Sequence, residues 1–89
     1  MARYVCDVET NGLLPVLNRI HSLVLRDIDT GEAISCSEHG KYFPIQYGLD
    51  LLSKADLLVG HNFINFDLRA ISKVYPTFKI KENCDVHDT

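Results

Sequence analysis

The amino-acid sequence predicts a small α/β domain built on a mixed β-sheet. Its first half holds three segments in which apolar and polar residues alternate as they do in strands. Its second half alternates two helical patterns with one short apolar run and one weaker strand segment. The order is therefore three strands, helix, strand, helix, strand, which brings antiparallel and parallel neighbours into one sheet. A chain of 89 residues has room for one such domain.

The first half of the chain supplies the antiparallel part of the predicted sheet. Three strands are expected, at residues 2–8, 20–28 and 33–37. Asn11 and Gly12 provide a turn signal after the first strand. The sequence Asp-Thr-Gly-Glu at residues 29–32 is typical of a tight turn, so the second and third strands are expected to pair as a hairpin.

A helix and a buried strand are expected next. Pro44 suits the first turn of a helix, and apolar residues then recur on one face at Ile45, Leu49 and Leu52. The continuous apolar run at residues 57–60 is typical of a strand that is covered on both faces.

The last part of the chain predicts a second helix and a weaker strand. The helix is expected at residues 66–75, with Asn65 as its N-terminal cap. Pro76 ends it, because the residue before a proline is driven out of the helical conformation. A fifth strand is expected at residues 80–86, where it would form an unpaired edge of the sheet.

Composition and charge exclude several classes of protein. A net charge of −3 excludes nucleic-acid binding through bulk positive charge, although not an enzyme that holds nucleic acid through metal ions. The apolar runs are too short to span a membrane, and the N-terminus lacks a signal pattern. The scattered Cys6, Cys36 and Cys84 favour reduced thiols. We therefore expect a cytoplasmic protein without a membrane partner, in the host cytoplasm if a phage encodes it.

Three carboxylates indicate a metal site. Asp7 and Glu9 lie two residues apart in the first strand, so both side chains point to the same face. Like charges this close repel each other, and a fold keeps them mainly where a cation neutralises them. Asp67 lies near the predicted start of the second helix, where the helix dipole tolerates an anion. Together they predict a two-metal phosphodiester-cleaving site. The simpler alternative is a solvated strand face and an ordinary helix start.

Two sequence motifs carry a family resemblance. Residues 7–10, Asp-Val-Glu-Thr, and residues 61–67, His-Asn-Phe-Ile-Asn-Phe-Asp, resemble the first and second motifs of the DEDD-superfamily 3′–5′ exonuclease domain. Residues 82–84, followed by Asp88 and Thr89, resemble the segment that introduces the third helix of such domains. The resemblance is strongest to the N-terminal proofreading domain of bacteriophage-type family A DNA polymerases.

This resemblance implies a fold, a reaction and a cofactor. The fold would be ribonuclease-H-like, with residues 1–89 forming the N-terminal part of the exonuclease domain, truncated before the last helices. Asp7 and Glu9 would be catalytic metal ligands that bind two Mg²⁺ or Mn²⁺ ions, and Asp67 would hold one of these ions. The reaction would be hydrolysis of the 3′-terminal phosphodiester of single-stranded DNA, with release of a nucleoside 5′-monophosphate.

Three further residues are candidates for contact with the substrate. The resemblance implies that Leu13 lies beneath the terminal base and that Asn62 orients the strand. Phe63 is an aromatic residue beside the second motif, so it is a candidate for stacking on a base, with packing in the core as the alternative.

The resemblance also implies what an active domain would need in addition. Family members have a last aspartate, preceded at a set spacing by a tyrosine or histidine that handles the attacking water, and neither follows residue 67 here at that spacing. We therefore expect weak metal binding and negligible activity for these 89 residues alone. The remainder of the polymerase or a second chain would complete the site. The sheet face that a later helix covers in the family would permit self-association.

Two other functions are compatible with the same sequence. One is a non-catalytic nucleic-acid-binding or assembly module that keeps the fold. The other is a stand-alone exoribonuclease of the same superfamily, which would recognise the 2′-hydroxyl of RNA.

Overall fold

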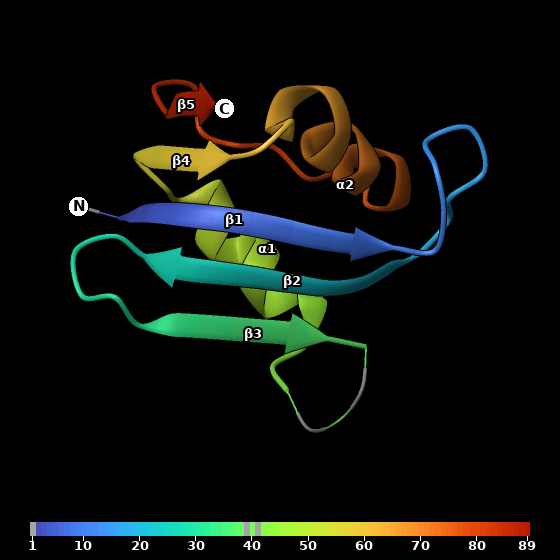
Figure 1. Cartoon of the computed structure of the whole chain (residues 1–89), viewed down its shortest axis with the longest axis horizontal. Coiled ribbons are helices and arrows are strands. Elements are labelled where there is room, and N and C mark those ends of the chain that lie inside the picture. Colours follow the sequence, from blue (N-terminus) through green and yellow to red (C-terminus); the bar gives the residue numbers. More distant parts are fainter. Residues whose placement is uncertain (1, 39, 41) are drawn as a thin grey trace.

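A computed structural model describes residues 2–38, 40 and 42–89 of the chain (Figure 1). Its strands are β1 (Arg3–Thr10), β2 (Ile20–Asp27), β3 (Ala33–Ser37), β4 (Leu57–Gly60) and β5 (Asp85–Asp88). Its helices are α1 (Ile45–Ser53) and α2 (Leu68–Val74), and a five-residue π-helical turn, η1 (Phe63–Asp67), lies between β4 and α2. The strands form one sheet in the order β3-β2-β1-β4-β5, which confirms the predicted mixed α/β class.

The direction of the strands decides which ends of the sheet meet. β1 pairs with β2 in antiparallel fashion, and β2 with β3 likewise, as the hairpin predicts. β1 is parallel to β4, and β4 is parallel to β5. The carboxyl ends of β1, β4 and β5 therefore lie along one edge of the sheet, where η1 and α2 follow β4 (Figure 1).

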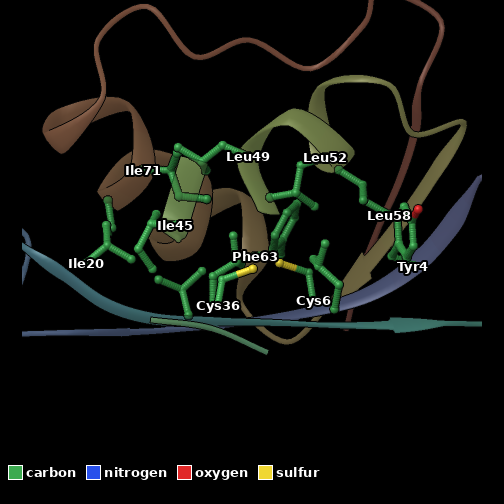
Figure 2. Close-up of a cluster of buried hydrophobic side chains, with 14 of the residues drawn as sticks. Tyr4, Cys6, Ile20, Cys36, Ile45, Leu49, Leu52, Leu58, Phe63 and Ile71 are labelled. Atoms are coloured by element: carbon green, nitrogen blue, oxygen red, sulfur yellow. The ribbon is translucent and has the colours of Figure 1, made fainter. Parts of the chain in front are cut away.

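The hydrophobic core lies between one face of the sheet and the two helices (Figure 2). Tyr4, Cys6 and Val8 alternate along β1 and point into this core, where Phe63 is completely buried. In the part of the chain that the structure describes, no helix covers the opposite face, and Val5 and Val24 are 43% and 37% exposed there. Self-association through this face stays a prediction.

The second helix does not begin where the sequence predicts. Asn65 is not its cap, because Asn65 lies inside η1 and α2 begins only at Leu68. Asn62 precedes η1 in the left-handed conformation, with φ 52°. The helical backbone begins early because Phe63, the first residue of η1, is anchored in the core, and a π-helical turn absorbs the residues before α2.

Three strand predictions also need correction. The fifth strand lies at Asp85–Asp88 and not at residues 80–86, because Ile80 packs against the core and Lys81 pairs with Asp56. β4 is fully buried on one face only, since its residues alternate between buried and half-buried. β1 continues to Thr10, two residues beyond its predicted end at 8. Among the residues described, neither helix is long and apolar enough to cross a membrane.

The packing of α1 on the sheet leads to a stability prediction. Gly48 lies so close to β2 and β3 that an added Cβ would stand 2.6 Å from Leu23 Cδ2 and 2.8 Å from Cys36 Sγ. Crowding of this kind costs ~1–3 kcal/mol, and the better helix propensity of alanine offsets up to ~1 kcal/mol. We therefore expect Gly48→Ala to lower the free energy of unfolding by about 1–2 kcal/mol in a denaturant titration.

A glycine in open space provides the control for this measurement. An added Cβ at Gly40 meets nothing within 4 Å, so Gly40→Ala should leave stability nearly unchanged. Equal stability of the two variants would show that α1 does not pack on the sheet as closely as described.

Candidate metal-binding site

The first two predicted ligands lie side by side on β1. Asp7 and Glu9 are exposed on the face opposite the core. Cys6, which precedes them, and Val8, which lies between them, are buried. Asp7 pairs with Val24 of β2, which is exposed on the same face. The two carboxylates therefore share one face of the strand, as their spacing in the sequence predicts, and that face is exposed to solvent.

The third predicted ligand has a different environment. Asp67 is the last residue of η1 and is only 5% exposed. Its pKa is raised from 3.8 to about 7, first by burial and then by the negative charges of Asp7, Asp88 and Glu9. Burial also raises the pKa of the Cys6 thiol, with Asp67 and Asp7 as further causes. Asp67 therefore lies within electrostatic reach of both carboxylates on β1, although more than fifty residues separate them in sequence.

The chemistry of these residues fits a hard divalent cation. Carboxylate oxygens are the ligands that Mg²⁺ and Mn²⁺ prefer, and a cation would offset the neighbouring negative charges that, after burial, raise the pKa of Asp67. Within residues 2–38, 40 and 42–89, however, no three potential ligands are already close enough together to hold an ion. The donor set fits, and the carboxylates would have to move closer together when an ion binds.

The loop after β1 holds Leu13 in a defined position. The side-chain oxygen of Asn11 accepts hydrogen bonds from the backbone N–H groups of Asn18 and Arg19, both at 3.1 Å, which closes the loop. The ammonium group of Lys73 on α2 donates to the Leu14 carbonyl at 2.6 Å. Leu13 itself is 73% exposed, so it is available to contact a ligand near the carboxyl end of β1.

Sequence reasoning missed a second exposed apolar residue on this loop. Val16 is 74% exposed, and its backbone N–H donates to the Leu13 carbonyl at 3.0 Å. The backbone N–H of the next residue, Leu17, also donates to the Leu13 carbonyl, at 2.8 Å, and the Leu17 side chain is buried. The turn thus buries one apolar residue and exposes two, which the sequence pattern alone does not reveal.

The two candidates after β4 have opposite environments. Asn62 is exposed, and its backbone N–H donates to the Thr89 carbonyl at 3.4 Å. Phe63 is 0% exposed, so the prediction that it stacks on a base is wrong. Its ring packs in the centre of the core (Figure 2), against Gly60, where an added Cβ would stand 2.8 Å from the Phe63 side chain. The alternative considered for Phe63, packing, is the one that the structure shows.

Asp88 was not predicted as a functional residue, yet it lies at the same edge of the sheet. It ends β5, and its two carboxylate oxygens accept hydrogen bonds from Phe63 and Ile64. Nothing in the sequence signals this contact, because it depends on the parallel pairing of β4 with β5.

Comparisons with known proteins identify the fold. A solved family B DNA polymerase from the hyperthermophilic archaeon Pyrobaculum calidifontis superimposes with a TM-score of 0.68 at 16% identity. The match covers 97% of this chain and 13% of that polymerase. The chain has a polymerase-related fold. Its five-stranded mixed sheet with two helices is consistent with the ribonuclease-H-like class that the motifs predict. The comparison does not support the narrower resemblance to family A of the phage type.

The sequence comparisons add no family assignment. No protein-family model matches the chain, and no curated protein matches it. The structural likeness at 16% identity therefore shows the fold alone, and the activity is a matter for proposal.

The raised pKa of Asp67 predicts how stability depends on pH without metal. The folded state holds the Asp67 proton more tightly than the unfolded chain, because the pKa is about 7 in the fold and near 3.8 otherwise. Its contribution to stability is therefore complete below about pH 4 and is lost as the pH rises through about 7. Asp67→Asn should remove this loss, so that its melting temperature gains on the wild type as the pH rises.

Thermal unfolding of both proteins between about pH 4 and about pH 8 would test this expectation. Asp50→Asn, which removes an exposed carboxylate on α1, is the control for net charge. If the melting temperatures of wild type and Asp67→Asn differ by the same amount at every pH, Asp67 does not titrate in this range.

Proposed function

We propose that this chain is the metal-binding part of a 3′–5′ exonuclease domain that works with a DNA polymerase. The observation that carries the proposal is the buried Asp67 of η1, which lies within electrostatic reach of Asp7 and Glu9 on β1. The order of residues 7–10 and 61–67 along the chain, which is that of the first two motifs of such domains, supports the proposal. The substrate would be the 3′ end of single-stranded DNA, and the product a nucleoside 5′-monophosphate.

The carboxylates would act together on divalent cations. Asp7 and Glu9 would hold Mg²⁺ or Mn²⁺ from the exposed face of β1, and Asp67 would complete the contact from η1. Bound ions of this kind supply an activated water and neutralise the charge that develops on the phosphate. Because Asp67 is buried, its interaction with a cation is screened less by water than that of an exposed carboxylate.

The neighbouring loop would position the nucleic acid. Leu13 and Val16 are exposed apolar side chains on a loop that Asn11 and Lys73 hold in place. Such side chains can pack against the faces of unstacked bases without reading their sequence. Asn62 is exposed, and its backbone N–H contacts Thr89 directly after β5, so its side chain would also contact the DNA strand.

A second candidate function is a non-catalytic assembly or nucleic-acid-binding module. It is favoured by the exposed Val5 and Val24 on the uncovered face of the sheet and by the lack of three ready-placed ligands among the described residues. Its partner would be the remainder of a polymerase or a second chain. This function predicts binding without a requirement for metal.

The metal site can be tested with Mn²⁺. We expect Mn²⁺ to broaden the amide signals of Asp7, Glu9 and Asp67 in nuclear magnetic resonance spectra. Asp7→Asn removes a predicted ligand and should weaken the binding at least about tenfold. Asp50→Asn removes an equal charge from α1 and should have little effect. Unchanged binding in Asp7→Asn, or broadening centred elsewhere, would refute the site.

The substrate can be tested by anisotropy of a labelled oligonucleotide. In the presence of Mg²⁺ we expect binding to a single-stranded DNA with a free 3′ end, and weaker binding to a circular strand. Leu13→Ser should reduce the affinity several-fold because it removes an apolar contact with a base. Ile28→Ser is the matched control. Ile28 is 40% exposed and directly follows β2, whereas Leu13 lies in the loop before β2, at the opposite end of this β-strand.

The alternatives predict different results in the same experiment. Binding that is independent of Mg²⁺ and equal for linear and circular strands would favour the assembly or binding module. A preference for a matched RNA over DNA would favour the exoribonuclease, which recognises the 2′-hydroxyl.

A further inference from the structure

The start of η1 is held by a carboxylate from another strand. The backbone N–H of Phe63 donates to one oxygen of Asp88 at 3.0 Å, and that of Ile64 donates to the other oxygen at 2.9 Å. The first N–H groups of a helical segment have no partner within it, so they require an acceptor from outside. The side chain of Asn62, which precedes η1, makes no such bond. Asp88 therefore provides the N-terminal cap in its place.

Pairing of the strands brings Asp88 to this position. β5 is parallel to β4, and Asp88 is the partner of Gly60, the last residue of β4. The Thr89 N–H donates to the Gly60 carbonyl at 2.9 Å, and the Asn62 N–H donates to the Thr89 carbonyl at 3.4 Å. These bonds continue the ladder from the sheet into the turn that follows β4, so Asp88 cannot shift without disturbing it.

η1 connects this cap to the predicted metal ligand. The Phe66 N–H donates to the Asn62 carbonyl at 3.0 Å, and the Leu68 N–H donates to the Phe63 carbonyl. The Phe63 side chain is fully buried against Gly60 and anchors the first residue of the turn in the core. Asp67 is the last residue of the same turn. A change in the direction of the first N–H groups would therefore displace Asp67.

We propose that Asp88 is a positioning residue, which holds η1 through two backbone hydrogen bonds and so directs Asp67 toward Asp7 and Glu9. This inference rests on the proposed metal site and adds a residue to it. Both oxygens of Asp88 accept backbone N–H groups, which leaves them poorly placed to bind an ion directly. A direct ligand role is the competing explanation, because Asp88 is one of the charges that surround Asp67.

The experiment compares three variants of the 89-residue chain. Asp88→Ala removes both acceptors, and Asp88→Asn keeps one oxygen. Asp85→Asn removes an exposed charge from the same strand and is the control. In metal-free protein, we expect amide hydrogen exchange at Phe63 and Ile64 to be about tenfold faster in Asp88→Ala and intermediate in Asp88→Asn. The affinity for Mn²⁺ should fall in the same order, and Asp85→Asn should match the wild type in both measurements.

Two results would overturn the proposal. Normal protection of Phe63 and Ile64 combined with weaker Mn²⁺ binding would show that Asp88 is a ligand. Faster exchange at both amides with unchanged Mn²⁺ binding would show that the cap is structural and does not position Asp67. If Asp88→Ala fails to fold, Asp88→Asn decides between these outcomes.

A further measurement separates this proposal from the proposed function. If wild-type protein binds no Mn²⁺ at the carboxylates, the proposed metal site fails. Nuclear Overhauser contacts between η1 and β1 in metal-free protein then test the positioning alone. Their loss in Asp88→Asn supports the role of Asp88, and their full retention refutes it.

Discussion

The parallel alignment of β1, β4 and β5 is the constraint on which the rest of this structure depends. Because the three strands run in one direction, their carboxyl ends share an edge of the sheet. Asp7 and Glu9 lie toward that end of β1, η1 follows the end of β4, and Asp88 ends β5. Crevices beside the carboxyl ends of parallel strands are common ligand sites in α/β proteins. An antiparallel β4 would put η1 and Asp67 at the opposite edge, away from both carboxylates.

Burial of Asp67 links the proposed function to the stability of the fold. A carboxyl group with a pKa of about 7 is held in a place that disfavours its charged form. The metal-free protein therefore gives up stability at neutral pH, and a bound cation would restore it by favouring the carboxylate. Strongly perturbed pKa values cluster at functional sites, so the raised pKa of Asp67 supports its proposed role.

The sequence predicts the elements of this fold better than their ends. The hairpin of β2 and β3 follows from local turn chemistry, and α1 follows from the spacing of Ile45, Leu49 and Leu52. The start of the second helix was misplaced because Asn65 has the local properties of a cap. The position of η1 is decided instead by the burial of Phe63 against Gly60, a tertiary contact. For the same reason the sequence does not reveal that Phe63, an aromatic residue beside a motif, is buried and does not stack on a base.

Two aspartates at the same turn show where prediction from sequence ends. Asp67 lies in the second motif, which predicts it as a metal ligand, whereas no motif predicts the contacts of Asp88. The oxygens of Asp88 accept hydrogen bonds from two backbone N–H groups of η1. Asp67 is buried beside other carboxylates, which destabilise its charge. One aspartate therefore holds the backbone of η1, and the other is the proposed ligand of a cation. The contacts of Asp88 depend on the pairing of β5 with β4, so they follow from the topology and not from a sequence motif.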